Sequence, residues 1–143
     1  MSYLMVAAAL ALSLNVADCP DSPNCVSSQA SAPGHRVEPF SYAGWSREAA
    51  QRALLAALAT LPRTAVVADQ AAQVKATATS ALFGFVDDLD FVFDDENHVI
   101  QVRSASRTGY WDLGVNARRI EDLREAFQQA LAQEKPPAPP ANR

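Results

Sequence analysis

The chain has 143 residues, the size of one domain, and a chain of this length buries about two-thirds of its unfolded surface. Apolar residues make up 49% of the sequence and charged residues 20%, which excludes the disordered and fibrous classes. The formal charge of −4 excludes a general electrostatic attraction to nucleic acid or anionic lipid, so either kind of binding would need a local basic patch. We therefore expect no nucleic-acid partner.

An apolar segment from Leu4 to Leu14 contains one polar residue, Ser13. It is too short to cross the hydrocarbon core of a bilayer, which takes about 20 residues. Its length matches the hydrophobic region of a secretory signal peptide, and Ala17 is a small residue of the kind that precedes a cleavage site. We expect residues 1–17 to be a signal peptide, the mature protein to be periplasmic, and the mature chain to have no transmembrane segment. A buried amino-terminal helix is the alternative.

Two cysteines, Cys19 and Cys25, follow in the string CPDSPNCVSSQ. In an exported protein, an even number of cysteines at short spacing predicts a disulfide. Acylation of Cys19 as a lipoprotein anchor is the alternative, although Asp18 stands where such signals want a small residue. The other residues that commonly bind zinc are His35 and His98, and together with the two cysteines they lack the paired spacing of zinc sites. We therefore expect no metal, and we expect no cofactor.

The segment from Val26 to Tyr42 is rich in Ser, Ala, Pro and Gly and predicts an irregular stretch on the domain surface. Ser46 is a suitable start for a helix, which Pro62 ends. The apolar residues between them recur at helical spacing and predict one buried stripe, formed by Ala50, Ala53, Leu54, Ala57, Leu58 and Leu61.

Four later segments predict strands, because they are β-prone or alternate between apolar and polar residues. These strands are Thr64–Asp69, Val74–Thr79, Asp88–Asp94 and Val99–Arg107. The polar turn between the last two consists of Asp95, Glu96, Asn97 and His98.

The register of the last two strands follows from the demand that their apolar side chains share one side of the sheet. This register places Asp90 opposite Arg103 on the other side, with Asp88 within reach of Arg103 and Arg107. The sequence therefore predicts a charged face behind the apolar one. The apolar pairs in this register are Phe93 with Ile100 and Phe91 with Val102.

A last helix is predicted with Asn116 as its cap. Its buried stripe is Ile120, Leu123, Phe127, Ala130 and Leu131. The expected fold is α+β: a four-stranded, mostly antiparallel sheet with two amphipathic helices on one face, preceded by a cysteine-bearing amino-terminal arm. Residues 18–134 form this single domain, and the proline-rich residues 135–143 form a disordered tail.

Three strings, CPDSPNCVSSQ, LFGFVDDLDF and IQVRSASRTGYWDLGVNARRIEDLR, resemble the domain of unknown function 1499 family of uncharacterised bacterial and plastid proteins. The resemblance runs from about Cys19 to about Phe127 and implies no established reaction. The short leader before the first cysteine departs from the usual pattern of the family. The positions that the resemblance marks as signature residues are Cys19, Cys25, Asp87, Asp88, Arg103, Ser104, Ser106, Arg107, Asp112, Asn116 and Arg119.

Arg118 and Arg119 lie in the first turn of the last helix, where the partial positive charge of the helix start disfavours cations. An anion bound at this helix start would offset the repulsion, and Arg103 and Arg107 could converge on it from the sheet. Neutralisation within the protein is the favoured alternative, because it needs no ligand. The carboxylates available for it are Asp112, Glu121 and Asp122.

Two further observations bear on function. A carboxylate and a serine could form a catalytic set, but a hydrolase of the usual kind also needs a histidine between them, and both histidines are predicted in a loop and a turn. Trp45, Tyr110 and Trp111 lie at element ends, where aromatic residues more often close a core than bind a ligand. The candidate catalytic residues are Asp87, Asp88, Asp90, Ser104 and Ser106.

We expect a cell-envelope binding module that recognises an anionic small molecule or envelope partner. A small hydrolase-like enzyme and an accessory subunit of an envelope complex are the alternatives. The expected binding residues are Asp87, Asp88, Asp90, Arg103, Ser104, Ser106, Arg107, Asp112, Asn116 and Arg119.

Overall fold

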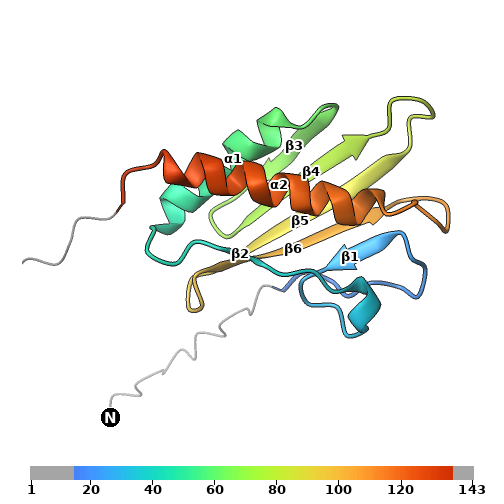
Figure 1. The fold of residues 1–143 in the computed structure, drawn as a ribbon, viewed down its shortest axis with the longest axis horizontal. Coiled ribbons are helices and arrows are strands. Elements are labelled where there is room, and N and C mark those ends of the chain that lie inside the picture. Colours follow the sequence, from blue (N-terminus) through green and yellow to red (C-terminus); the bar gives the residue numbers. More distant parts are fainter. Residues whose placement is uncertain (1–14, 137–143) are drawn as a thin grey trace, which may run out of the picture.

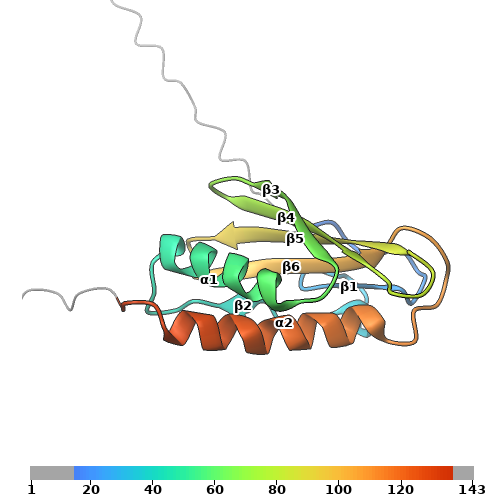
Figure 2. The same cartoon turned by 90° about the horizontal axis from the view of Figure 1, so that it is seen from above.

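The computed structural model describes residues 15–136, so the apolar segment 4–14 and tail residues 137–143 lie outside the described residues. Two helices, α1 (Arg47–Thr60) and α2 (Val115–Ala132), cover one face of an antiparallel sheet, as Figures 1 and 2 show. The α+β class and the two helices on one face are therefore confirmed. Within residues 15–136, no helix is both long and apolar enough to cross a membrane.

The sheet has six strands, not the four predicted. The two further strands are β1 (Cys25–Ser27) and β2 (Phe40–Ser41), which both pair with β6 along the same edge. Apart from Cys25, their residues lie in the segment predicted to be irregular, and the strands are too short to show an alternation of apolar and polar residues. The four predicted strands are β3 (Thr64–Asp69), β4 (Gln73–Thr79), β5 (Val86–Asp94) and β6 (Val99–Ser106), in the order β1-β6-β5-β4-β3.

The predicted register between β5 and β6 is confirmed. Phe91 opposes Val102, and Asp90 opposes Arg103. Because side chains alternate along a strand, this register sends the apolar residues of both strands toward the helices and leaves the charged pair on the outer face of the sheet.

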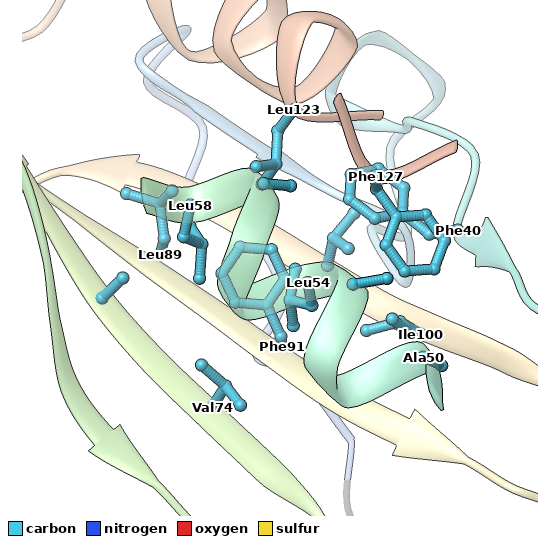
Figure 3. Packing of buried hydrophobic residues seen from close by; sticks show 14 of the residues in the cluster. Phe40, Ala50, Leu54, Leu58, Val74, Leu89, Phe91, Ile100, Leu123 and Phe127 are labelled. Carbon is cyan, nitrogen blue, oxygen red and sulfur yellow. The ribbon is translucent and has the colours of Figure 1, made fainter. Parts of the chain in front are cut away.

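The core lies between the sheet and the helices. Helix α1 begins at Ser46, whose side chain accepts a hydrogen bond from the Ala49 backbone N–H at 3.1 Å, as the sequence predicted. Figure 3 shows the contacts between the layers: side chains of both helices meet those of the strands. The labelled residues include Leu54 and Leu58 of α1, Leu123 and Phe127 of α2, and Val74, Leu89, Phe91 and Ile100 of the sheet, all buried.

The amino-terminal arm lies over the outer face of the sheet. The Ala17 carbonyl accepts a hydrogen bond from Ser27 Oγ at 3.1 Å, and the Asp18 carbonyl accepts one from Arg103 Nε at 3.3 Å. Both donors belong to paired positions of β1 and β6 whose side chains point away from the helices. The arm therefore covers part of the charged face that the sequence predicted.

Cys19 and Cys25 form the predicted disulfide. The bond closes a loop of a few residues, so in the chain-entropy description it stabilises the fold by about 2 kcal/mol. In this structure the Cys19 sulfur is bonded to Cys25 and is not available for the alternative acylation.

Reduction of this disulfide is expected to lower the free energy of unfolding by about 2 kcal/mol without unfolding the domain, because the core does not depend on so small a loop. Urea unfolding of the full-length protein with and without reductant measures the difference. The double variant Cys19→Ala/Cys25→Ala is the control, since reductant should not change its midpoint. A domain that unfolds completely in reductant alone would contradict this expectation.

Candidate functional site

The structure divides the predicted site residues between the two faces of the sheet. Asp87 of β5 and Ser104 of β6 are buried beneath the helices, whereas Asp88 and Arg103 point to the outer face. Neighbouring residues on a strand alternate between faces, so Asp87 and Asp88 cannot line one surface. The predicted set is therefore two clusters with different surroundings.

Asn116 is the centre of the inner cluster. Its side chain is fully buried, and its amide oxygen accepts hydrogen bonds from Ser104 Oγ at 2.6 Å and from Arg119 Nη1 at 2.9 Å. Arg119 Nη1 also donates to Ser104 Oγ at 3.2 Å. The fully buried side chains of Asn116 and Ser104 thus connect α2 to β6.

The amide nitrogen of Asn116 extends this cluster to the loops. Its two N–H groups are shared among three acceptors: Asp112 Oδ2 at 2.8 Å, Ser106 Oγ at 3.0 Å and the Asn24 carbonyl at 3.1 Å. We call this set the Asn116 network. It comprises Asn24, Asp87, Ser104, Ser106, Asp112, Asn116 and Arg119.

Asn24 is a member that the sequence did not predict. It is 5% exposed, and its side chain donates to the Gly109 carbonyl at 2.9 Å and accepts from Ser22 Oγ at 2.8 Å. The disulfide loop is thereby tied to the loop between β6 and α2. No sequence signal singled it out, because Asn24 lies among polar residues and prolines in a loop that shows no periodicity.

Asp112, not Asn116, caps α2. Its carboxylate accepts hydrogen bonds from the backbone N–H groups of Gly114 at 2.8 Å and Asn116 at 3.0 Å. The prediction of Asn116 as the cap is therefore wrong. Gly114 holds the backbone position before the first helical residue, with φ of 79°, while the Asp112 side chain supplies the capping hydrogen bonds. A Cβ at position 114 would lie 3.0 Å from Arg118 Nη1. Burial raises the pKa of Asp112, but the hydrogen bonds from Asn116 and Gly114 outweigh it, and the pKa lies below its usual value.

Arg119 forms an ion pair with Asp87, with 2.7 Å between Nη2 and Oδ2. The two side chains are only 15% and 10% exposed. Internal neutralisation, the favoured prediction, is confirmed for Arg119, but its partner is on β5 and is none of the carboxylates proposed from the sequence. Those were close in the sequence, whereas Asp87 comes close only when α2 packs on the sheet.

The outer cluster is a set of exposed ion pairs. Arg107 binds both oxygens of Asp88 at 2.9 Å, and Lys75 Nζ lies 3.3 Å from Asp90 Oδ1. The hydrogen bonds from Arg107 lower the pKa of Asp88, against a smaller opposing effect of burial. Arg103 opposes Asp90 in register but donates to the Asp18 carbonyl of the arm, so Asp88 pairs with Arg107 and Asp90 with Lys75. A hollow of about 330 Å³ lies beside them.

Two adjoining hollows open at the end of the sheet where α2 begins. The first, which we call the arginine hollow, has a volume of about 340 Å³. Its charged lining residues are Arg63, Asp87, Arg118, Arg119 and Asp122.

The second, the aromatic hollow, has a volume of about 330 Å³ and lies between the β4–β5 and β6–α2 loops. It shares Ser80, Asp87 and Val115 with the arginine hollow, so the two hollows adjoin at the edge of the Asn116 network. Trp45 packs against the core as predicted, whereas Tyr110 and Trp111 do not close a core and are 70% and 72% exposed. Its large apolar lining residues are the aromatic Phe83, Phe85 and Trp111 and the aliphatic Leu113.

Both serines of the inner cluster, Ser104 and Ser106, form hydrogen bonds with the Asn116 side chain. Ser104 is fully buried and donates its hydroxyl proton to Asn116. His35 contacts the Cys25 carbonyl through Nδ1, and in residues 15–136 no histidine bonds to a serine. The same part of the chain contains no group of three or more residues arranged to hold a metal ion. This geometry provides recognition groups more readily than an activated nucleophile.

A family model described as "Protein of unknown function (DUF1499)" matches residues 15–127, which contain the disulfide loop, all six strands and most of α2. No curated protein matches the chain.

Proposed function

The chain belongs to the DUF1499 family of proteins of unknown function, and we propose that it is a binding module that takes an anionic group into the arginine hollow. The proposed place of action is the cell envelope. The disulfide supports this compartment, because such bonds persist where the surroundings are oxidising.

The observation that carries the proposal is that the guanidinium groups of Arg63 and Arg118 bond to backbone carbonyls and not to carboxylates. Arg63 Nε donates to the Thr79 carbonyl at 3.0 Å, and Arg118 Nη1 donates to the Leu113 carbonyl at 2.9 Å. Among residues 15–136, neither guanidinium has an ion-pair partner, although the chain carries an excess of carboxylates. A backbone carbonyl orients a guanidinium without neutralising it, so both keep donors and charge for an anion.

Arg119 has a different part in this proposal. Its charge is balanced by Asp87, and its second amino group is held by Asn116 and Ser104. The start of α2 already holds the Asp112 carboxylate, so the incoming anion is expected to bind guanidinium groups and not the helix terminus. Arg119 therefore supports the wall of the hollow, and the binding groups are Arg63 and Arg118.

Inorganic phosphate is expected to raise the melting temperature of the full-length protein. Above the dissociation constant, each tenfold increase in phosphate adds about 1.4 kcal/mol to the stability. Replacing Arg118 by glutamine should remove most of this shift, because the glutamine amide keeps a donor for the Leu113 carbonyl but carries no charge. Thermal unfolding in phosphate and in chloride of equal ionic strength measures the effect.

Arg107→Gln is the matched control, since Arg107 is an exposed arginine on the other face of the sheet. Its phosphate shift should equal that of the unmodified protein. Equal melting temperatures in phosphate and chloride, or an equal loss of the shift in both variants, would contradict the proposal.

A further inference from the structure

Exposed apolar side chains gather on two loops at one end of the molecule. In Figure 1 the β4–β5 and β6–α2 loops extend farthest at the end of the long axis where α2 begins. They carry six of the nine exposed large apolar residues of the described chain. We call this surface the loop end, and it consists of Leu82 (82% exposed), Phe83 (72%), Phe85 (55%), Tyr110 (70%), Trp111 (72%) and Leu113 (68%).

Four of these side chains, Phe83, Phe85, Trp111 and Leu113, line one hollow and are therefore not scattered. The rings of Phe83 and Phe85 lie 5.7 Å apart, and the aromatic hollow is lined by residues of both loops. Single exposed apolar residues are normal on a protein surface, but a contiguous group marks a place where something else binds.

The loop end is also held in a defined shape. The β6–α2 loop is fixed by Asp112, which caps α2, and by the Asn24 side chain, which binds the Gly109 carbonyl. The β4–β5 loop is closed by two hydrogen bonds between Ser80 and Phe85. Apolar tips on fixed loops bind without the entropy cost of ordering them first.

The charges beside the loop end identify the occupant. Arg63 is in the turn between α1 and β3, and Arg118 is in the first turn of α2. Along the long axis in Figures 1 and 2, both segments lie inward of the loop tips, toward the middle of the molecule. The order from the tips inward is thus apolar and aromatic residues, then unpaired guanidinium groups. A bilayer presents the same order in depth, with hydrocarbon beyond a layer of phosphates, and Trp and Tyr favour that boundary.

We propose that the loop end docks onto the surface of an anionic lipid bilayer, with its apolar side chains in the interface and Arg63 and Arg118 on lipid phosphates. This inference rests on the proposed function, because the arginine hollow receives the lipid phosphate as its anion. A fluid bilayer accommodates projecting tips, whereas a folded partner needs a cavity shaped to them.

The test is flotation of the full-length protein with vesicles of phosphatidylcholine alone or mixed with phosphatidylglycerol. Binding is expected to the mixed vesicles, and Phe83→Ser and Trp111→Ser should each weaken it about tenfold, a loss of about 1.4 kcal/mol. Both side chains are exposed, so these substitutions leave the core intact. Val67→Ser, which removes a 61% exposed apolar residue from β3, is the matched control and should bind like the unmodified protein.

A second readout follows Trp111 directly. In the Trp45→Phe variant, Trp111 is the one remaining tryptophan, and brominated lipid should quench its fluorescence on docking. Vesicle binding that survives both loop substitutions, or unquenched Trp111 in vesicle-bound protein, would overturn the proposal. So would a dimer that Phe83→Ser converts to a monomer while vesicle binding stays unchanged, since the loop end would then join two copies of the chain.

The two proposals fail in different ways. Absence of vesicle binding together with a normal phosphate shift overturns the docking and leaves the anion site standing. Absence of the phosphate shift, with vesicle binding that depends on the loops but is unaffected by Arg118→Gln, overturns the anion site and the arginine contacts proposed for docking.

Discussion

Replacing Arg119 by methionine is expected to lower the free energy of unfolding by about 3–5 kcal/mol, because it leaves the Asp87 carboxylate buried without its partner. The substitution keeps most of the side-chain volume, so the loss measures the missing charge and hydrogen bonds and not a cavity. Urea unfolding monitored by circular dichroism gives the value.

The protein contains its own control for this experiment. Asp88 is the next residue on β5 and also pairs with an arginine, Arg107, but on the outer face with side chains 43% and 52% exposed. Water solvates both groups when the pair is broken, so Arg107→Met should change stability by little. The contrast between adjacent aspartates isolates burial as the cause.

A double substitution tests the mechanism. Asp87→Leu combined with Arg119→Met removes both charges, and it should recover part of the stability that Arg119→Met loses. A single variant as stable as the unmodified protein, or a double variant with the summed loss of both single changes, would show that the ion pair does not carry the effect.

Asn116→Ala is expected to destabilise the protein by about 3 kcal/mol, because the substitution leaves several buried partners without hydrogen bonds. These partners belong to the disulfide loop, β6 and the start of α2, so the loss should also loosen the loop end. Hydrogen exchange of the Gly114 amide, which Asp112 holds, should speed up more than exchange in the centre of β5.

Asn97 provides the comparison, since its amide also donates to an aspartate, Asp94, at 2.8 Å, but in an exposed turn. Asn97→Ala should cost about 0.5 kcal/mol or less, because water replaces the lost partner. If the two asparagine variants were equally stable, the Asn116 network would not hold the loops, and the defined shape assigned to the loop end would lose its basis.

The layered fold could be predicted from the sequence where local periodicity is strong. The stripe of α1, from Ala50 to Leu58, and the alternation of β5 and β6 each repeat over enough residues to fix both the element and its buried side. Strands β1 and β2 could not be found in this way. They have three and two residues, and each is a strand because its backbone pairs with the edge of β6.

The candidate site was predicted in its composition but not in its arrangement. The resemblance marked the residues Asp87, Ser104, Asp112, Asn116 and Arg119, and these do meet in one network. The roles assigned to Asn116 as cap and to Asp112 as a partner of the arginines were wrong, because both depended on sequence distance alone.

What the sequence by itself determined is therefore what neighbouring residues decide together: two helical stripes, the four longer strands, one register and a short disulfide loop. Only the tertiary structure decided that Arg119 meets Asp87, that Arg63 and Arg118 have no ion-pair partner among residues 15–136, and that two distant loops form one apolar end. The reason is physical. Periodicity sets the face on which a side chain lies, but the partner of a buried charge is set by packing between elements far apart in the chain, and no local pattern records that distance.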